Sequence, residues 1–482
     1  MVEFMVHLGG CIMRKTKMIC GIGPATQDWE VFKKLVKNGM NVVRVNFSHA
    51  TMEERRIDEE LVERARRELG ANVAILYDTK GPDLRTCNFE NNEIEFICGN
   101  TIRIVKEDVI GNKDRISFNY SQVINNLEVG TMILLNDGFV RLEVLSVEED
   151  GVTCKILDDA VLSSRRGVNI PGVDLNIPFI SEDDEADIKY ACEHDGDFLG
   201  ISFVSSVDDV RAARSLLEKY GKGDMQILSK IETAKAIENI DSIIDETDGI
   251  IVARGDLSVE VPFIEVPVLQ KEILRKCREK GKICIVATEM LKSMCKNSRP
   301  TKAELTDVST AVFDGADAVW LSDETTIGAH PDLASQYLGE ISEVAEKHYD
   351  KYCTKYNVEG NHEMHDLIAR SVVSAAEDLD VKVIVAATMS GFTAQKISNL
   401  KPDAYILAPV PDEKVARRLV LNWGVYPVVV GEYDSTDEVV NDGVAKAKEF
   451  MNLSQGDKII ITGGFPNTGA KTTNFMKIEE IK

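Results

Sequence analysis

A lysine and two acidic residues stand at the ends of two consecutive apolar runs. Lys230 interrupts the run Gln226–Ile231 near its end, and Glu232 follows two places later. Asp256 follows the next run, Gly249–Ala253. Because neighbouring parallel strands end at one rim, we expect these three side chains to meet. Two carboxylates with water suit Mg²⁺, and a lysine beside them suits a phosphoryl or enolate charge. The alternative interpretation is a structural ion pair at that rim.

These residues belong to a longer pattern of short apolar runs that end in polar residues or glycine. The runs are Thr16–Gly21, Asn41–Phe47, Val73–Tyr77, Asp197–Val204, Gln226–Ile231, Gly249–Ala253, Lys282–Ala287 and Ala316–Leu321. Helical spacing is clearest at Trp29–Asn38, Glu53–Leu69, Val207–Tyr220, Val266–Lys280 and Lys302–Asp314. It is also present at Ala236–Ile244, and a loop is expected at Arg254–Asp256. This repetition predicts an α/β fold, a (β/α)₈ TIM barrel. A doubly wound open sheet is the alternative, but eight regular units favour closure.

Two further domains are expected around the barrel. Alternating runs separated by turns lie at Ile102–Val105, Thr131–Leu135, Phe139–Val147 and Gly151–Ile156. They predict a small β-barrel domain, 83–178, inserted after the third strand, where it is suited to act as a lid. Helix and strand patterns restart near residue 350 and predict a C-terminal α/β domain, 351–482. The barrel then comprises 14–82 and 179–350.

Composition narrows the class of protein. The net charge of −24 argues against nucleic acid and anionic membranes as main partners. The ten cysteines form no C-x-x-C pair, so a cytoplasmic location is expected. No run of 18 apolar residues is present, and the first thirteen residues have no basic start typical of a signal peptide. Those residues are interpreted as an extension before a start near Met13.

Nine segments together resemble the pyruvate kinase family, in the family's order and from about Thr16 to the carboxyl end. They are TKMICGIGPAT (16–26), NVVRVNFSHA (41–50), DTKGPDLRT (78–86), RRGVNIPG (165–172), SKIE (229–232), DGIIVARGDL (248–257), VATEMLKSM (286–294), RPTKAE (299–304) and LSDET (321–325). The resemblance implies a cytosolic enzyme, usually a homotetramer, that moves a phosphoryl group between phosphoenolpyruvate and ADP or ATP.

The resemblance also implies roles for single residues. Glu232 and Asp256 correspond to ligands of Mg²⁺ or Mn²⁺, and Lys230 to the lysine that stabilises the phosphoryl group and the enolate. Thr288 corresponds to the residue implicated in enolate protonation, for which a water relay is more plausible than direct donation. Substrate contacts are expected from Arg44, Lys230, Arg254, Gly255, Asp256 and Thr288.

Nucleotide and monovalent-cation sites follow from the same resemblance. Nucleotide contacts are expected from Asn46, His49, Arg85 and Arg166, and K⁺ ligands from Asn46, Ser48, Asp78 and Thr79. Asp83 stands where potassium-dependent members carry glutamate, which favours K⁺. The alternative is that Asn46 and Ser48 only cap a strand end.

Four positions depart from the family pattern. Asp323 replaces the glycine of LSGET, Glu289 replaces a glutamine, Asn136 replaces the first aspartate of D-D-G, and Ser258 replaces a glycine. Asp323 and Glu289 add negative charge near the expected metal, so they put metal preference and rate in doubt.

The C-terminal domain carries a candidate effector site. The residues are Thr388, Ser390, Gly391, Thr393 and Lys471. Backbone amides and hydroxyls at a strand-to-helix turn suit phosphate. Because Lys471 is the only cation expected there, we predict a singly phosphorylated ligand over a bisphosphate, with a plain turn as the alternative.

Two apparent motifs are rejected. The segment Gly464–Thr472 approaches a P-loop, but a strand rather than a helix is expected after it. His362 and His365 have the wrong spacing for a zinc helix.

Two other functions stay open beside phosphoryl transfer. One is a lyase or aldolase that uses Lys230 as a Schiff-base amine, and the other is a sensor that binds phosphometabolites without catalysis. The lid and the arginines Arg44, Arg85 and Arg166 favour a nucleotide, which a lyase does not need.

Overall fold

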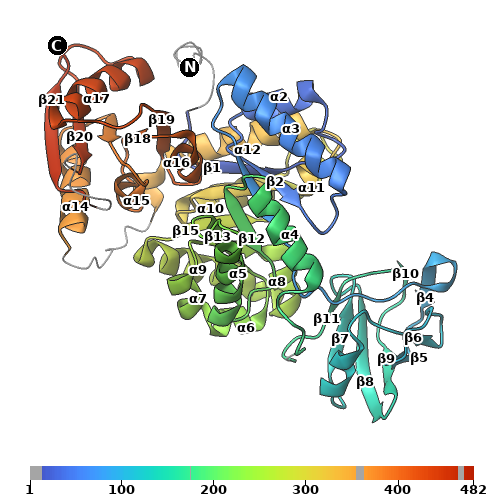
Figure 1. Ribbon diagram of the computed structural model, residues 1–482. Helices are drawn as coiled ribbons and strands as arrows, with labels where there is room; N and C mark the ends of the chain where they lie inside the picture. The colour runs from blue at the N-terminus through green and yellow to red at the C-terminus, as the bar shows by residue number, and fades with distance from the viewer. Residues whose placement is uncertain (1–12, 174, 354–362, 465–471) are drawn as a thin grey trace.

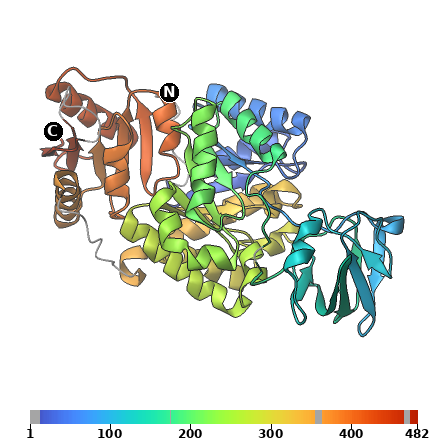
Figure 2. The same cartoon turned by 60° about the horizontal axis from the view of Figure 1, so that its bottom comes forward.

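The protein was analysed as a computed structural model that describes residues 13–173, 175–353, 363–464 and 472–482. Figure 1 shows three parts: a central barrel, a lid beyond one side of it, and a C-terminal sheet beyond the other. The view turned by 60° keeps the lid and the C-terminal part on opposite sides of the barrel (Figure 2). The exact domain limits stay predictions.

Eight parallel strands close the barrel, each paired with two neighbours. They are β1 (Lys17–Gly21), β2 (Val42–Asn46), β3 (Ala74–Asp78), β12 (Phe198–Ile201), β13 (Gln226–Ile231), β14 (Gly249–Ala253), β15 (Ile283–Ala287) and β16 (Ala318–Leu321). β1 pairs with both β2 and β16, so the ring has no free edge. The predicted TIM barrel is confirmed, and the open-sheet alternative is wrong.

Helices cover the outside of the barrel. They are α2 (Trp29–Lys37), α3 (Met52–Leu69), α4 (Glu182–Glu193), α5 (Val207–Lys219), α6 (Ala234–Glu238), α7 (Ile240–Glu246), α8 (Arg254–Glu260), α9 (Val266–Lys280), α10 (Lys302–Phe313), α11 (Asp323–Thr326) and α12 (Pro331–Glu346), followed by the single turn α13 (Tyr349–Tyr352). Thr51, Ser181 and Thr301 each form a capping box that fixes a helix start. No helix in the described ranges has both the length and the apolar character needed to cross a membrane.

Two details differ from the pattern expected around the catalytic strands. The helical stretch expected at Ala236–Ile244 is divided at Asn239, which ends α6 and precedes α7. The Arg254–Asp256 segment, expected as a loop, forms the first turn of α8. Helix α8 begins at Arg254, directly after the last residue of β14, and the apolar run alone does not indicate this helix start.

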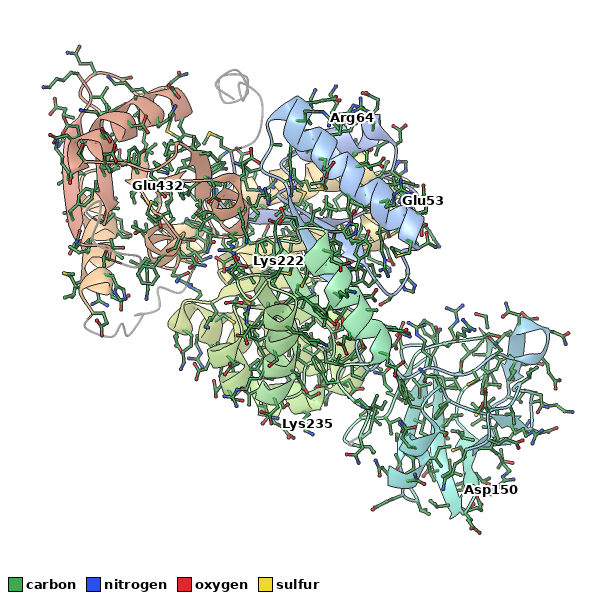
Figure 3. All side chains as sticks on the ribbon, in the orientation of Figure 1. Glu53, Arg64, Asp150, Lys222, Lys235 and Glu432 are labelled. Atoms are coloured by element: carbon green, nitrogen blue, oxygen red, sulfur yellow. The ribbon has the colours of Figure 1, made fainter. Side chains whose placement is uncertain are left out.

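The lid is a curled sheet with its own apolar core. Its strands are β4 (Glu93–Phe96), β5 (Thr101–Val105), β6 (Arg115–Ile116), β7 (Met132–Leu135), β8 (Val140–Glu148), β9 (Gly151–Ile156), β10 (Ala160–Ser163) and β11 (Val168–Asn169). Six form a sheet in the order β11-β7-β8-β9-β5-β6, and β10 pairs with β4. Residues from both ladders share one buried core. Asp150, in the turn between β8 and β9, lies at the end of the lid that is far from the barrel (Figure 3).

The C-terminal part is a mixed α/β sheet. Its elements are α14 (Met364–Asp378), β17 (Val383–Ala386), α15 (Phe392–Ser398), β18 (Tyr405–Val410), α16 (Glu413–Arg418), β19 (Val425–Val429), α17 (Thr436–Phe450), β20 (Lys458–Gly463) and β21 (Phe475–Glu480). The strand order is β19-β18-β17-β20-β21, and only β21 is antiparallel to its neighbour. Residues 465–471 lie outside the described ranges, and the next element described after β20 is the strand β21, which agrees with the expectation of a strand after the P-loop-like segment.

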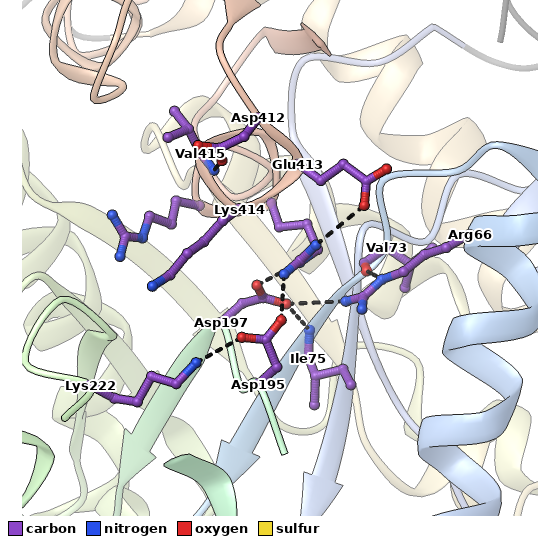
Figure 4. A network of polar contacts seen from close by, with 12 residues as sticks. Arg66, Val73, Ile75, Asp195, Asp197, Lys222, Asp412, Glu413, Lys414 and Val415 are labelled. Atoms are coloured by element: carbon purple, nitrogen blue, oxygen red, sulfur yellow. Dashed lines mark hydrogen bonds and ion pairs between the residues drawn. The ribbon is translucent and has the colours of Figure 1, made fainter. Parts of the chain in front are cut away.

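Buried ion pairs join this sheet domain to the amino-terminal end of the barrel. Asp197, directly before β12, accepts a hydrogen bond from Nε of Arg417 at 2.7 Å and pairs with Arg66 at 3.2 Å. Figure 4 shows these contacts between α16, α3 and the start of β12. Asp317, directly before β16, pairs with the buried Lys401. The barrel therefore has one end packed on the C-terminal domain and the other end turned toward the lid.

Candidate active site

Lys230 lies at the centre of the polar cluster on the lid-facing rim. Its Nζ donates to Oγ of Ser202 at 2.7 Å and lies 3.0 Å from Oε1 of Glu232. It also lies 3.4 Å from the Asp78 carboxylate. The predicted meeting of Lys230 with Glu232 is therefore present, and Ser202 and Asp78 complete the shell around the ammonium.

The charges around Lys230 determine its protonation. Burial alone lowers the pKa of this lysine, but the carboxylates of Asp78 and Glu232 outweigh burial and raise it above its ordinary value. A Schiff-base lysine needs a lowered pKa to act as a neutral nucleophile. The aldolase interpretation is therefore not supported, whereas a fixed cation for developing negative charge is.

At Glu232, in contrast, burial outweighs the attraction of the neighbouring opposite charge. It is 1% exposed, and its Oε2 accepts the backbone amide of Phe203 at 2.6 Å. Burial raises its pKa to about 7, Lys230 opposes this shift, and the nearby charge of Asp256 adds to it. A cation bound close to Glu232 and Asp256 would offset both the burial of the Glu232 carboxylate and its repulsion by Asp256, and would therefore lower the pKa of Glu232.

The two carboxylates fit a hard divalent cation. Over the residues that the structure describes, no group of three or more His, Cys, Asp or Glu side chains has a metal-site arrangement. Mg²⁺ commonly takes one or two carboxylates and completes its shell with water and substrate oxygens. Glu232 and Asp256 therefore suit Mg²⁺, whose remaining coordination positions would be filled by water and substrate oxygens rather than by further protein ligands.

Arg44 reaches the same cluster from β2. Its Nε and Nη2 donate to Oδ2 of Asp78 at 2.9 and 2.5 Å, and its guanidinium lies 5.3 Å from the ring centre of Trp320. Burial raises the pKa of Asp78, but Lys230 and Arg44 overcome that effect and hold it below the usual range. Asp78 therefore keeps a negative charge that orients both cations.

Thr288 lies at the end of β15 in a strained backbone. Thr288 and the exposed Glu289 have φ values of 66° and 56°, which non-glycine residues adopt at a cost of about 1–2 kcal/mol each. The Thr288 hydroxyl accepts the Gly255 amide at 2.8 Å. Thr288 and the first turn of α8 are thus tied together.

The guanidinium of Arg254 contacts residues outside the Lys230 cluster. Its guanidinium donates to Asp307 at 2.7 Å and to the Thr288 carbonyl at 2.7 Å, within the helix layer. Gly255 and Asp256 follow on the same turn, and Oγ of Ser258 donates to the Gly255 carbonyl at 2.7 Å. Arg254 therefore braces the turn that carries Asp256.

The residues expected to bind K⁺ end two adjacent strands. Asn46 on β2 is the register partner of Asp78 on β3, and Thr79 follows Asp78. Oδ1 of Asn46 accepts the Ser48 amide at 3.1 Å, which is the strand-capping contact of the alternative interpretation. All four residues present oxygen atoms, the donor type that suits a hard monovalent cation.

A cleft of about 600 Å³ lies between this rim and the lid. Among the residues that line it are His49, Lys80, Arg85, Asn88, Asn119 and Arg165. Burial and the nearby cations Arg85 and Arg44 lower the pKa of His49, so its imidazole favours the neutral form. Nε of Arg85 donates to Asp83 at 2.5 Å, so Asp83 already has a cationic partner. Asp83 and Asp108 also line the cleft, so its cations Lys80, Arg85 and Arg165 leave a small excess of positive charge, which suits an anionic ligand such as a nucleotide.

The expected nucleotide residues divide into two groups. His49 and Arg85 line the cleft, whereas Asn46 and Arg166 are not among its lining residues. Nε of Arg166 donates to Ser163 at 2.8 Å, while its neighbour Arg165, with a φ of 59°, borders the cleft. Because Arg165 has a left-handed backbone, the sequence Arg165-Arg166 alone does not indicate which of the two arginines borders the cleft. Lys80, which also lines the cleft, was not among the predicted nucleotide contacts, although its position two residues after β3 places it at the rim.

Asp323 has a partner that its sequence position does not suggest. Its carboxylate lies 2.5 Å from Nζ of Lys292, and both side chains are about half exposed. The added negative charge therefore has a compensating cation. Asn136 has a φ of 52° in the turn between β7 and β8, a conformation that asparagine tolerates well.

The C-terminal loop is described in part, since Lys471 lies outside the described residues. Oγ1 of Thr388 accepts the Gly391 amide at 3.0 Å, and Thr393 and Thr473 share a hydrogen bond of 2.7 Å. Ser390 is exposed. Two of the hydroxyls expected to bind phosphate thus have partners within the protein, as in a plain strand-to-helix turn. The zinc-like pair also lies partly outside the described residues, because His362 is not among them.

Comparison with known proteins gives one consistent result. The family model described as "Pyruvate kinase, barrel domain" matches residues 13–335, and "Pyruvate kinase, alpha/beta domain" matches 366–479. A pyruvate kinase of Clostridium acetobutylicum is 38% identical over 98% of this chain and 100% of its own. One of Bacillus licheniformis is 42% identical over 97% of this chain and 80% of its own. A crystal structure of a pyruvate kinase from Cryptosporidium parvum, 34% identical, superimposes with a TM-score of 0.89 and covers 100% of this chain and 97% of that one.

Proposed function

The chain belongs to the pyruvate kinase family, and we propose a role for each residue of the Lys230 cluster in the family's reaction. That reaction transfers the phosphoryl group of phosphoenolpyruvate to ADP and yields pyruvate and ATP. The observation that supports the assignment is the position of Lys230. A protonated lysine, held by Asp78, Glu232 and Ser202, stands at the rim beside a basic cleft.

Lys230 and Arg44 are the cations of the transfer step. The Lys230 ammonium offsets negative charge as it moves between the phosphoryl oxygens and the enolate, and the Arg44 guanidinium orients the phosphate. Asp78 holds both cations in place before substrate binds. Preorganised charge of this kind does not have to be rearranged during the reaction.

Thr288 and the start of α8 act on the remaining part of the substrate. The amides of Gly255 and Asp256 receive the substrate carboxylate, while Arg254 supports their turn through Asp307. Thr288 assists protonation of the enolate carbon through a water molecule, because a threonine hydroxyl is a weak acid. Its strained backbone keeps the hydroxyl beside Gly255.

Two cations complete the proposal. Mg²⁺, or Mn²⁺, held by Glu232 and Asp256, would supply positive charge to the carboxylate and phosphoryl oxygens of the substrate. K⁺ held by Asn46, Ser48, Asp78 and Thr79 would add charge beside the phosphoryl group. ADP is assigned to the cleft that includes His49 and Arg85, with Lys80 and Arg165 as additional contacts.

A coupled assay with ADP and phosphoenolpyruvate tests the function and both cations. We expect turnover that requires Mg²⁺ and rises with K⁺ over Na⁺. Asp83→Lys should relieve the K⁺ requirement by placing an ammonium near the site. Full activity in potassium-free sodium buffer would contradict the K⁺ assignment, and no turnover with both cations present would contradict the function.

The proposal extends to the oligomeric state, the location and the regulation of the enzyme. A cytoplasmic homotetramer is the state expected from the family. A singly phosphorylated effector is assigned to Thr388, Ser390, Gly391 and Thr393, with Lys471. Activation curves with AMP, ribose 5-phosphate and fructose 1,6-bisphosphate test it, and strong activation by the bisphosphate alone would contradict the preference.

A further inference from the structure

The two residues after β12, Ser202 and Phe203, contact both charged groups at the centre of the rim. Ser202 is 2% exposed and contacts Lys230. The Phe203 amide contacts Glu232. Neither residue carries charge, and each contacts a group that is assigned to the reaction. We call this pair the β12 elbow.

The hydrogen bonds of Ser202 fix the direction in which its hydroxyl points. Its Oγ lies 2.7 Å from the Thr79 carbonyl and 3.5 Å from Oδ1 of Asp78, and since both of these oxygens only accept, the hydroxyl proton belongs to the shorter bond, to Thr79. The lone pairs of Ser202 are then directed to Nζ of Lys230, also at 2.7 Å. This is the shortest contact recorded for the Lys230 ammonium, against 3.0 Å to Glu232 and 3.4 Å to Asp78.

A neutral acceptor has a specific use between two carboxylates. Asp78 and Glu232 attract Lys230 from two sides, and their attraction varies slowly with distance. A hydrogen bond depends on angle as well, so Ser202 defines where the ammonium points. Ser202 does this without adding negative charge that would compete with the phosphoryl group.

Phe203 arranges Glu232 in the same way. Its amide occupies Oε2 at 2.6 Å and leaves Oε1 toward Lys230. Phe203 has a φ of 57°, a left-handed conformation that is rare for a large residue. Such strain persists only where surrounding contacts impose it, and it gathers at functional sites. Gly81 closes the turn from the other side, since a Cβ there would lie 2.7 Å from the Ser202 carbonyl.

We propose that the β12 elbow positions the reacting charges, with Ser202 as the positioning residue for Lys230 during phosphoryl transfer. This inference rests on the proposed function. It extends that function by a residue that binds no substrate atom and acts through the direction of the ammonium. The consequence is a loss in turnover rather than in substrate affinity when the hydroxyl is removed.

Ser202→Ala tests this proposal against Ser342→Ala as a matched control. Ser342 on α12 is also a buried serine, and its Oγ donates to a backbone carbonyl, that of Leu338, at 2.8 Å. Ser202→Ala should lower kcat about ten- to hundredfold, the range for losing a hydrogen bond to a charged group. The Kd for phosphoenolpyruvate, measured by calorimetry with Mg²⁺ and K⁺ but without ADP, should change less than about threefold. Ser342→Ala should leave both values near wild type.

The outcomes separate the inference from the function that it assumes. An inactive wild type would contradict the proposed function. An active wild type with equal kcat for the two alanine variants would overturn the role of Ser202, and so would a loss confined to the Kd. If Ser202→Ala fails to fold, Ser202→Cys takes its place, because a thiol fills the space but bonds weakly. A folded Ser202→Cys with wild-type kcat would equally overturn the proposal.

Discussion

The two ends of the barrel each hold a cluster of charges around a buried aspartate, Asp197 at one end and Asp78 at the other, and the clusters differ in net charge. At the amino-terminal end, Asp195, Asp197 and Glu413 meet the three cations Arg66, Lys222 and Arg417. At the rim, the three carboxylates of Asp78, Glu232 and Asp256 lie near the two cations Lys230 and Arg44. The first cluster is neutral when all its groups are ionised, whereas the second has one negative charge in excess.

This difference in net charge distinguishes a cluster that stabilises the fold from a cluster that is suited to bind a cation. A neutral, closed network satisfies its members and holds two domains together. Burial raises the pKa of Glu232 to about 7, the nearby charge of Asp256 adds to the shift, and the excess of carboxylate leaves the rim suited to bind a cation. Strand β12 runs between the two clusters, with Asp197 before it and Ser202 after it.

The largest expected effect comes from breaking the balanced cluster. Asp197→Ala leaves the guanidinium of Arg417 buried without its main partner and weakens the hold on Arg66. Removing one member of a buried pair typically costs about 3–5 kcal/mol. We expect a clear fall in the denaturation midpoint, with kcat of the folded fraction within about threefold of wild type. Asp195→Ala, at a side chain 59% exposed, is the control and should cost about 1 kcal/mol or less. Equal midpoints for the two variants would contradict the structural reading of Asp197.

The next effect comes from removing the central cation of the rim. Lys230→Met should lower kcat by at least about 10²–10³-fold, because preorganised charge at the reacting group is lost. Substrate binding should persist through Arg44 and the α8 turn. Lys235→Met, an exposed position on α6, is the matched control (Figure 3). More than a tenth of wild-type turnover in Lys230→Met would show that this lysine does not stabilise the transfer step.

A third prediction uses the excess charge at the rim. Because burial raises the pKa of Glu232 to about 7, a proton competes with Mg²⁺ below that pH. The apparent Mg²⁺ affinity should therefore fall as the pH drops from 7, by up to about tenfold per unit for one displaced proton. Above pH 7 it should level off, since Glu232 is then ionised. Calorimetric Mg²⁺ titrations at several pH values measure this slope.

Two variants identify the source of that slope. Glu232→Gln should abolish the slope, because its amide does not titrate in this range. Asp256→Asn should weaken Mg²⁺ at every pH, since one anionic ligand is lost. A slope that survives Glu232→Gln would assign the titration to another group.

Much of this arrangement could be predicted from the sequence, for a physical reason. Buried parallel strands read as short apolar runs, and β13 and β14 match their predicted limits. The rim geometry of the barrel then brings Lys230 and Glu232 together without further information.

The missed features depend on partners distant in sequence or on backbone conformation. The Ser202 hydroxyl bonds a carbonyl 123 positions earlier in the chain, and nothing in the sequence around Ser202 indicates this partner. The left-handed φ of Phe203 and Arg165 is imposed by surrounding contacts, so residue type does not signal it. The hydrogen bond from Arg254 to the Asp307 carboxylate on α10 joins residues 53 positions apart, so the sequence does not indicate it, and the substrate contact of Arg254 stays a prediction.

The smallest expected effect concerns the exposed pair of Asp323 and Lys292. Their contact of 2.5 Å involves side chains that are 46% and 53% exposed, so water and salt screen the attraction. Asp323→Asn keeps the size and removes only the charge, and it should cost about 0.2–1 kcal/mol in stability. Since Lys292 already compensates Asp323, kcat and the Mg²⁺ requirement should change less than about threefold. Lys292→Gln leaves Asp323 uncompensated beside the rim, so it should alter the Mg²⁺ titration more than Asp323→Asn does, and 1 M salt should reduce that difference. A tenfold rise in kcat for Asp323→Asn would show that its charge acts on the metal site despite Lys292.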